Sequence, residues 1–174
     1  LNETIKRGAR LLDFEIYSLD GEPVIAAGEE SSANGKYLLK GTYNSISFSK
    51  VMNQIKMMAF SGSVAPNPND PLFLSFRIKS NNRNIFRTMT SVLTKAFSGY
   101  FLSQKYGYDG KYTVDGRDII ANIPILDLRR KVIIIVEDLN NNYRGTPFEA
   151  LVNMSGKAKD GSGMPFVNIY KNID

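Results

Sequence analysis

The chain has 174 residues, of which 43% are hydrophobic and 22% charged, a balance that indicates an ordered globular domain and excludes a disordered segment. It contains no cysteine and no histidine, which excludes disulfides, zinc–thiolate sites and every nucleophile that depends on a histidine base. The net charge of +5 favours phosphates, anionic membrane surfaces or acidic proteins as partners. The longest apolar run, residues 132–136, is too short to cross a bilayer, so we expect no transmembrane segment.

The first third of the chain predicts a hairpin between two helices. The expected elements are a helix end over residues 2–9, a strand over 11–17, a returning strand over 23–27, a loop over 28–42 and a helix over 48–59. The pair Asp20-Gly21 is a strong turn signal between the two strands. Ser47 is the expected N-cap of the helix, whose apolar residues recur at the spacing of one helix face.

The remaining two thirds predict further alternation of strands and helices. The expected elements are a loop over residues 61–71, a strand over 72–78, a helix over 85–101, a loop over 104–117, a helical turn over 124–128, a strand over 132–136, a short helix over 147–152, a loop over 155–163 and a strand over 166–170. The strand over 132–136 is apolar on both faces, which is typical of a parallel sheet covered by helices. We therefore expect βαβ units and an α/β fold.

Two acidic residues interrupt the apolar pattern of the first strand. Asp13 and Glu15 are two positions apart, so in a strand they point to the same face. Adjacent carboxylates repel each other, and burying them without a partner costs free energy. We therefore expect a cation between them: a metal ion, an arginine or a lysine.

Several segments, in order along the chain, carry a family resemblance. Residues 8–15 read Gly-Ala-Arg-Leu-Leu-Asp-Phe-Glu and residues 21–28 read Gly-Glu-Pro-Val-Ile-Ala-Ala-Gly. They are similar to the Gly-Cys-Arg-x-x-Glu-Leu-Asp strand and the Gly-Glu-Pro-x-x-x-His-Gly hairpin in the X-box of phosphoinositide-specific phospholipase C, a Ca²⁺-dependent phosphodiesterase with a TIM-like barrel. Further similar segments follow in the family's order at residues 46–60, 71–76, 131–135 and 150–153.

This resemblance implies a partial (β/α)8 TIM-like barrel, in which residues 1–174 form a single X-box-like domain that supplies roughly strands two to five. A complete barrel needs about 250 residues, so we expect the sequence, which begins with Leu1, to be part of a longer chain. Half a barrel exposes sheet edges and apolar helix faces. We expect protein neighbours or further chain to cover them.

The sequence departs from the family at the catalytic positions. Ala27 stands where the family has its second catalytic histidine, and Ile135 and Val136 stand where it keeps a lysine for the substrate phosphate. The first catalytic histidine would come from a strand before Leu1. The resemblance therefore gives no confident catalytic residue.

The metal site of the family is also altered. Asp13 and Glu15 match two Ca²⁺-binding acids, but Arg77 stands at the position of a third. A guanidinium bridges carboxylates bidentately, so we expect Arg77 to substitute for the metal, which leaves the two acids as vestigial ligands and the domain without a cofactor. An internal ion pair with Arg77 or Arg10 is favoured over a functional metal site.

Three functions follow from the resemblance. The favoured one is a catalytically impaired phospholipase C-like domain with a structural or interaction role in a larger assembly, such as a virion or a cytoplasmic complex. The alternatives are a phosphoric diester hydrolase that acts on lipids with a histidine from outside this segment, and a module that binds lipid phosphates. Loss of a general acid typically costs a factor of about 10² to 10⁴ in rate, so we lean against an enzyme.

The basic residues leave the partner open. Lys79, Arg83 and Arg87 follow Arg77 closely, and such a cluster is more typical of a solvated face than of a nucleic-acid site, because no aromatic residues alternate with it. We therefore expect no nucleic acid as a partner. An anionic membrane surface or a phosphoinositide remains open.

Overall fold

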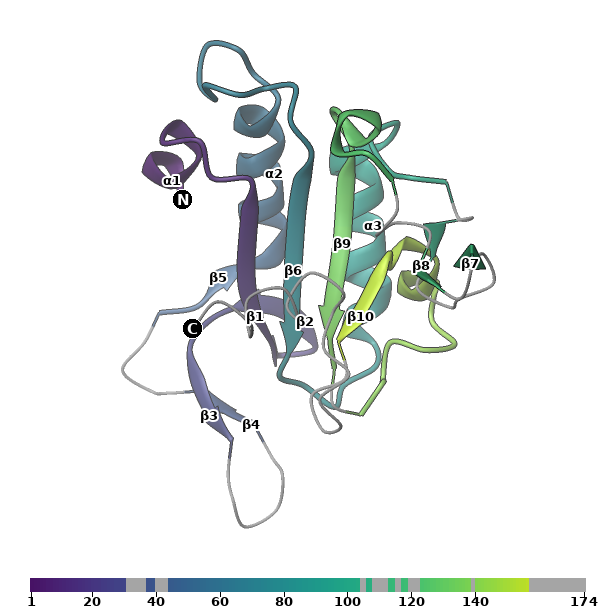
Figure 1. Cartoon of the computed structure of the whole chain (residues 1–174). Coiled ribbons are helices and arrows are strands. Elements are labelled where there is room, and N and C mark those ends of the chain that lie inside the picture. The colour runs from purple at the N-terminus through teal and green to yellow at the C-terminus, as the bar shows by residue number, and fades with distance from the viewer. Residues whose placement is uncertain are drawn as a thin grey trace, which may run out of the picture.

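The computed structural model describes residues 1–30, 37–39, 44–103, 106–107, 113–114, 117–118, 123–138 and 140–156. These residues form an α/β structure with a six-stranded mixed sheet and two long helices (Figure 1). The strands of the sheet, in the order in which they lie side by side, are β10 (Met154–Gly156), β9 (Val132–Glu137), β6 (Leu72–Ile78), β1 (Leu11–Leu19), β2 (Glu22–Ile25) and β5 (Ile46–Ser47). The helical segments are α1 (Asn2–Lys6), α2 (Phe48–Ala59), α3 (Ile85–Phe97) and the 3-10 turns η3 (Ile125–Leu128) and η4 (Pro147–Leu151).

Four of the strands are parallel and lie in the order of the chain. β1 pairs with β6, β6 with β9, and β9 with β10. The segment before β6 contains α2, the segment between β6 and β9 contains α3, and both helices lie on the same face of the sheet (Figure 1). The predicted α/β fold is confirmed. In the described part of the chain the sheet is open, with β10 at one edge and β5 at the other.

A tight turn joins β1 to its antiparallel neighbour β2. Asp20 and Gly21 both have positive φ angles, 51° and 85°, as the type I′ turn of a two-residue hairpin requires. Leu19 and Glu22 pair directly across this turn. The turn predicted from Asp20-Gly21 is therefore present and fixes the register of the hairpin.

The main core lies between the sheet and the two long helices. Alternate residues of the parallel strands point to this side, and side chains such as Ile16 and Leu74 are fully buried there. Phe76 lies near its centre, with its ring centroid 5.4 Å from that of Phe48 in α2 and 6.4 Å from that of Phe148 in η4. Aromatic contacts of this kind add to the free energy of burial.

The opposite face of the sheet carries a smaller apolar cluster. Ile133, Ile135 and Met154 are buried in it, and Phe73 packs against them. Leu11, at the start of β1 on the same face, is 59% exposed. On this face of β1, Leu11 is therefore exposed at the start of the strand, whereas Tyr17 is buried further along it.

Most elements predicted from the sequence are confirmed at the predicted positions. They include the helix over 48–59, the strand over 72–78 and the helical turns at 124–128 and 147–152. Ser47 is the N-cap of α2, although its side chain makes no capping hydrogen bond. Among the described residues, no helix combines the length and the apolar composition that crossing a bilayer requires.

The helix predicted over residues 85–101 is shorter than expected. It ends at Phe97, and Gly99 follows with a φ of 83°, a left-handed conformation that turns the chain away from the helix axis. Phe101 then forms a parallel bridge with Val132. The apolar residues after Phe97 therefore extend the sheet and not the helix.

Short strands account for the other errors. The predicted loop over residues 28–42 contains β3 (Gly28–Glu30) and β4 (Tyr37–Leu39), which form a hairpin. The predicted loop over 104–117 overlaps a second hairpin, of β7 (Thr113–Val114) and β8 (Arg117–Asp118). β5 and β10 were also not predicted, because two or three residues are too few to show the alternation of a strand. The strand predicted over 166–170 lies outside the described residues.

Two methionines of α2 test how this helix packs. Met52 is fully buried against the sheet, whereas Met57 is 69% exposed. We expect Met52→Ala to lower the free energy of unfolding by about 2–5 kcal/mol, because it leaves a cavity, and Met57→Ala to lower it by less than about 0.5 kcal/mol. Urea denaturation followed by circular dichroism measures both values. Equal losses would show that α2 does not pack through this face.

Candidate functional site

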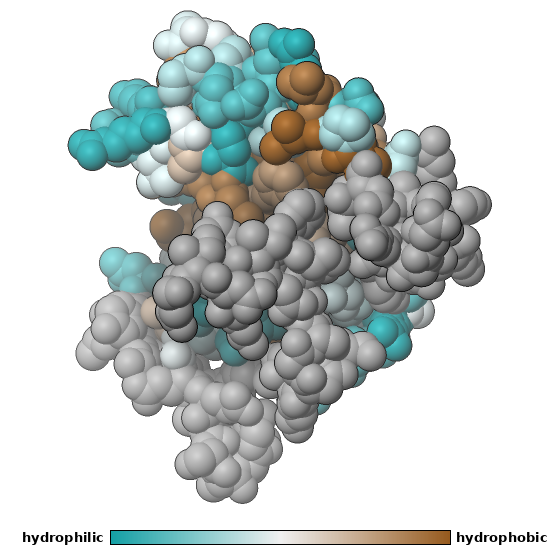
Figure 2. Space-filling view, viewed as in Figure 1, coloured by the Kyte–Doolittle hydropathy of each residue, from teal (hydrophilic) through white to brown (hydrophobic). Residues whose placement is uncertain are grey.

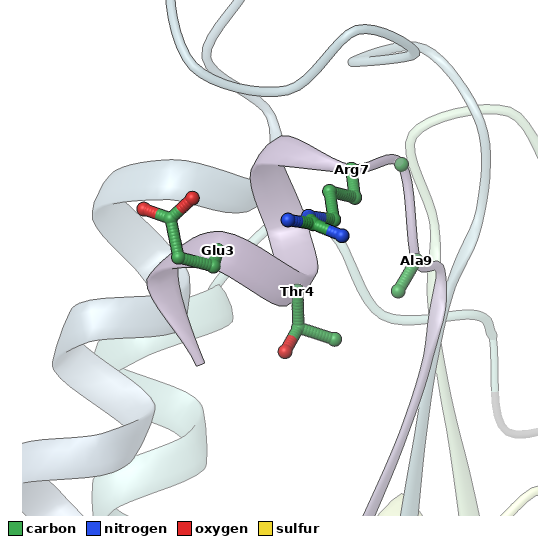
Figure 3. A pocket seen from close by; sticks show the side chains of 5 residues that line it. Glu3, Thr4, Arg7 and Ala9 are labelled. Atoms are coloured by element: carbon green, nitrogen blue, oxygen red, sulfur yellow. The ribbon is translucent and has the colours of Figure 1, made fainter.

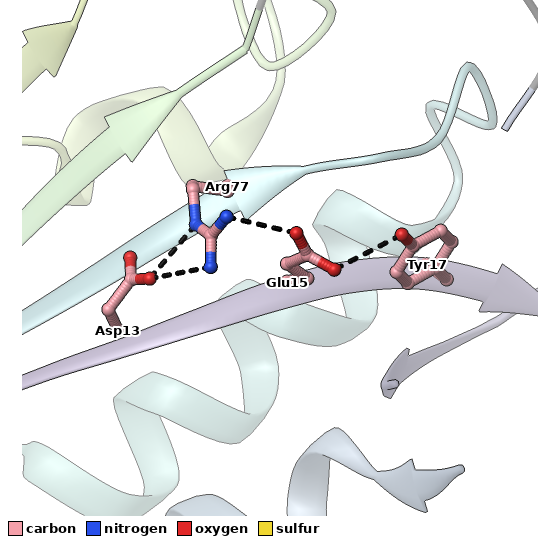
Figure 4. A network of polar contacts seen from close by, with 4 residues as sticks. All are labelled: Asp13, Glu15, Tyr17 and Arg77. Atoms are coloured by element: carbon pink, nitrogen blue, oxygen red, sulfur yellow. Dashed lines mark hydrogen bonds and ion pairs between the residues drawn. The ribbon is translucent and has the colours of Figure 1, made fainter. Parts of the chain in front are cut away.

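Arg77 lies between Asp13 and Glu15 and binds both (Figure 4). Its Nε donates a hydrogen bond to Oδ2 of Asp13 at 2.9 Å, and its Nη2 is 2.8 Å from the same oxygen. Its Nη1 donates to Oε1 of Glu15 at 2.9 Å, while the hydroxyl of Tyr17 donates to Oε2 of Glu15 at 3.2 Å. The ion pair predicted between Arg77 and the two acids is present. One guanidinium uses three nitrogen atoms on two carboxylates.

The parallel register of β1 and β6 explains why these side chains meet. It places Glu15 opposite Arg77 and Asp13 opposite Ser75. Residues that lie opposite each other share a face, so all of these side chains project from the side of the sheet that faces away from α2 and α3. Since Ser75 is small, the long side chain of Arg77 can extend back along β6 to Asp13.

The group remains partly open to solvent. The side chains of Arg77, Asp13 and Glu15 keep 37%, 38% and 23% of their surface exposed. Partial burial by itself would lower the pKa of Arg77, but the hydrogen bond to Asp13 and the charges of Asp13, Glu15 and Glu137 outweigh it and raise that pKa. The guanidinium is therefore a permanent charge.

A third acid, which the sequence did not single out, adjoins the group. Glu137 is the last residue of β9 and lies opposite Arg77 in the sheet register. Arg77 is itself the penultimate residue of β6. The group is therefore at the carboxyl ends of these parallel strands, where α/β proteins usually place their ligand sites.

Arg10, the other cation considered for the two acids, does not bind them. Its guanidinium donates to the backbone oxygens of Ala59 at 2.6 Å, Asp70 at 2.6 Å and Pro71 at 3.2 Å. Burial lowers its pKa, and the charge of Asp70 opposes that effect. Arg10 therefore joins the end of α2 to the loop before β6, and of the two arginines considered it is Arg77 that pairs with the acids.

The positions at which the family has catalytic groups carry none here. Ala27 is exposed, two residues beyond β2, and the backbone amide of its neighbour Ala26 donates to the backbone oxygen of Glu15 at 3.4 Å. In β9, Ile135 belongs to the small apolar cluster and Val136 to the main core. Ala27 thus lies near the acidic strand without a group that can transfer a proton.

The geometry does not fit a bound Ca²⁺. Within the described ranges, no three acidic, histidine or cysteine side chains come together as a metal would need. The nitrogens of Arg77 occupy the space between Asp13 and Glu15, at 2.8–2.9 Å from their oxygens. A Ca²⁺ ion needs about six to eight oxygen ligands, and a fixed positive charge among them would repel it.

Asp138 organises the loop beyond β9, a role that the sequence analysis did not anticipate. Its carboxylate is buried and accepts hydrogen bonds from the backbone amides of Asn140 at 3.1 Å and Tyr143 at 3.3 Å. Burial raises its pKa, while hydrogen bonds from the loop and the charge of Arg83 oppose that effect. The signal was available, because an aspartate followed by asparagines after an apolar strand is typical of a side-chain-capped turn.

Arg83 is not simply part of a solvated basic face. Its Nη2 donates to the backbone oxygen of Arg144 at 2.6 Å, and its charge acts on Asp138. Gly145, with a φ of 70°, lies close to the same guanidinium. Arg83 therefore connects the start of α3 to the loop after β9.

A surface hollow of about 610 Å³ beside α1 lies apart from the acidic group. Figure 3 shows Arg7 reaching across it towards Thr4, while Glu3 points away. Glu3 instead forms an exposed pair with Lys6 at 3.4 Å. Gly8 and Ala9 complete the lining of this hollow, which has few side chains that could bind or react with a ligand.

Comparison with known proteins adds no assignment. The chain matches no model of a protein family, and a search of curated proteins finds no match either. The resemblance to phospholipase C therefore rests on the residues described above.

The buried carboxylate of Asp138 predicts a pH dependence of stability. Since burial raises the folded pKa of Asp138 above its ordinary value of 3.8, the folded state binds more protons than the unfolded state, and the stability that this proton contributes is lost as the pH rises through the folded pKa. We expect Asp138→Asn to remove that loss, so that its free energy of unfolding increases relative to wild type as the pH rises above about 4. Urea denaturation at a series of pH values measures this difference, and a constant difference would contradict the prediction.

Removal of Arg77 leaves the two acids facing each other. We expect Arg77→Met to lower the free energy of unfolding by about 1–2 kcal/mol at neutral pH, a modest value because the group is partly exposed. Adding Asp13→Asn and Glu15→Gln should restore most of this loss, because the repulsion disappears. The control is Arg87→Met, on the outer side of α3. No recovery in the triple variant would show that charge is not the cause.

Proposed function

We propose that the chain is the X-box-like part of a divergent phospholipase C, a partial (β/α)8 barrel that no longer catalyses and serves a structural or interaction role in a larger assembly. The observation that carries this proposal is the bridge from Arg77 to Asp13 and Glu15. A virion is one assembly of this kind.

The arrangement of the strands supports a barrel origin. Half of a (β/α)8 barrel consists of four parallel strands in chain order with their helices on one face, and β1, β6, β9 and β10 with α2 and α3 have this arrangement. The face with Asp13, Glu15 and Arg77 would be the inside of that barrel, and these residues would lie towards its carboxyl end, where active sites form. Further chain or a protein neighbour would cover the apolar cluster around Ile133.

The loss of catalysis follows from two replacements acting together. The guanidinium of Arg77 offsets one of the two negative charges of Asp13 and Glu15 and lies between them, where a Ca²⁺ ion would otherwise bind. The methyl group of Ala27 cannot protonate a leaving group, and the 174 residues contain no histidine to replace it. Without the metal and the general acid, the residues of this segment lack both electrostatic stabilisation and proton transfer for phosphodiester cleavage.

A Ca²⁺ titration tests the proposal. We expect about 5 mM Ca²⁺ to leave the Tm of the wild type unchanged, because Arg77 fills the site. Arg77→Glu supplies a third acid in place of the cation and should gain a Ca²⁺-dependent rise in Tm of about 2–4 °C. Arg77→Gln is the matched control, because it removes the cation without adding an acid.

An activity measurement separates the alternatives. The wild type should release no inositol phosphate from vesicles that contain phosphatidylinositol, with or without Ca²⁺. Release that Asp13→Asn abolishes would overturn the proposal in favour of a hydrolase. Vesicle binding that Arg77→Gln abolishes would favour a lipid-phosphate module.

A further inference from the structure

The amino ends of the parallel strands carry a surface of a different kind, and we infer that it docks on an anionic lipid bilayer. Its apolar tip consists of Ile125 and Leu126, which are 62% and 71% exposed. Its basic collar consists of Arg129, Arg130 and Lys131, which follow directly in the chain. The inference goes beyond the proposed function and does not depend on Arg77.

The structure presents the tip in a fixed conformation. Ile125 and Leu126 begin the 3-10 turn η3, whose last residue, Leu128, is buried and anchors the turn to the body of the protein. The amide of Asp127 donates to the backbone oxygen of Pro124 at 2.9 Å, and the amide of Lys131 donates to the backbone oxygen of Leu128 at 3.0 Å. Two adjacent aliphatic side chains therefore face solvent on a held backbone, which is unusual unless something covers them.

Arg130 of the collar is also held in place by contacts with the body of the protein. The amide of Arg130 donates to the backbone oxygen of Asn69 at 2.9 Å, and its guanidinium lies 5.7 Å from the ring centroid of Phe60 and 5.9 Å from that of Tyr100. The rings of Phe60 and Tyr100 stack at 4.7 Å, with the guanidinium of Arg10 5.2 Å from Phe60. These cation–π contacts keep the positive charge at this end of the sheet.

The tip and Arg129 of the collar lie on one surface. Arg10, Phe73, Ile125, Leu126 and Arg129 line a common hollow of about 260 Å³, together with Asp70 and Pro71. Figure 2 shows hydrophobic residues gathered beside hydrophilic ones in the upper part of the face that it presents, the end at which Figure 1 places η3 and the start of β9. A bilayer can therefore meet apolar and cationic groups at the same time.

The charge of this surface is positive after its acids are counted. Asp70 lies beside Arg10 and accepts a hydrogen bond from Asn67 at 3.0 Å, and Asp127 lies within η3. The four cations Arg10, Arg129, Arg130 and Lys131 outnumber these two acids. A net positive rim complements the negative surface potential of anionic lipids.

The chemistry favours lipid over a protein partner. Arginine is also enriched at protein interfaces, so the choice of lipid rests on the tip, because two aliphatic side chains beside basic ones are the pattern of a segment that enters the headgroup region of an anionic bilayer. On docking, the tip would reach the acyl boundary while the collar stays level with the phosphates.

Vesicle co-sedimentation of the whole chain tests the inference. The probes are vesicles of phosphatidylcholine alone and of phosphatidylcholine with about 30% phosphatidylserine. We expect binding only to the anionic vesicles, weakened by salt, and reduced about tenfold or more by Ile125→Ser with Leu126→Ser. Met57→Ser, which removes an equally exposed apolar side chain on α2, should bind as the wild type does.

Charge variants separate a local effect from net charge. One double variant combines Arg129→Glu with Lys131→Glu. The control combines Lys50→Glu with Lys56→Glu, which changes the net charge by the same amount but on α2. We expect only the first pair to abolish binding. Equal losses in both would overturn a docking surface at η3, as would wild-type binding that ignores lipid charge.

The absence of tryptophan from the sequence permits a direct depth measurement. Leu126→Trp should give a blue-shifted emission with anionic vesicles and quenching by brominated lipids, whereas Met57→Trp should give neither. Arg77→Gln should leave this signal unchanged, so failure here and failure of the proposed function are distinguishable. Self-association that Ile125→Ser with Leu126→Ser removes, without any vesicle binding, would assign the surface to a second copy and overturn the inference.

Discussion

A single guanidinium determines whether the acids on the open face of this sheet can bind a metal. Arg77 joins β6 to two carboxylates of β1, and its raised pKa means that it never releases its charge. A metal would neutralise the same acids only while it is bound, because its occupancy depends on its concentration. Here the cation is part of the chain, so the positive charge that Arg77 places between Asp13 and Glu15 does not depend on a metal concentration.

The open face changes character along its strands. Near the amino ends it is apolar, with Leu11 and Phe73 close to the tip at η3, and near the carboxyl ends it carries Glu15, Arg77 and Glu137. The apolar amino end of the face and the charged group at its carboxyl end can therefore have different binding partners. A partner or membrane at the amino end need not disturb the charged group, since the two lie at opposite ends of the same strands.

The sequence predicted those features that depend on the local spacing of apolar residues. Alternation predicted the strand over residues 72–78 and put Asp13 and Glu15 on one face of β1, whereas the family resemblance singled out Arg77. Local patterns do not encode long-range register. The sequence therefore could not exclude Arg10 as the partner, because its three acceptors are backbone oxygens that only the fold brings together. Strands such as β10 escaped prediction because tertiary pairing, and not periodicity, defines them.

In the proposed origin from a phospholipase, the order of the replacements has a physical constraint. Loss of the third acid without a new cation would leave Asp13 and Glu15 with weaker metal binding and unrelieved repulsion. An arginine at position 77 meets both needs in one substitution, since it removes an acid and supplies the charge that the remaining two require. Loss of the histidine at position 27 carries no such cost, because Ala27 is exposed. Under this proposal the acids persist as partners of Arg77, which accounts for two carboxylates on one face of β1.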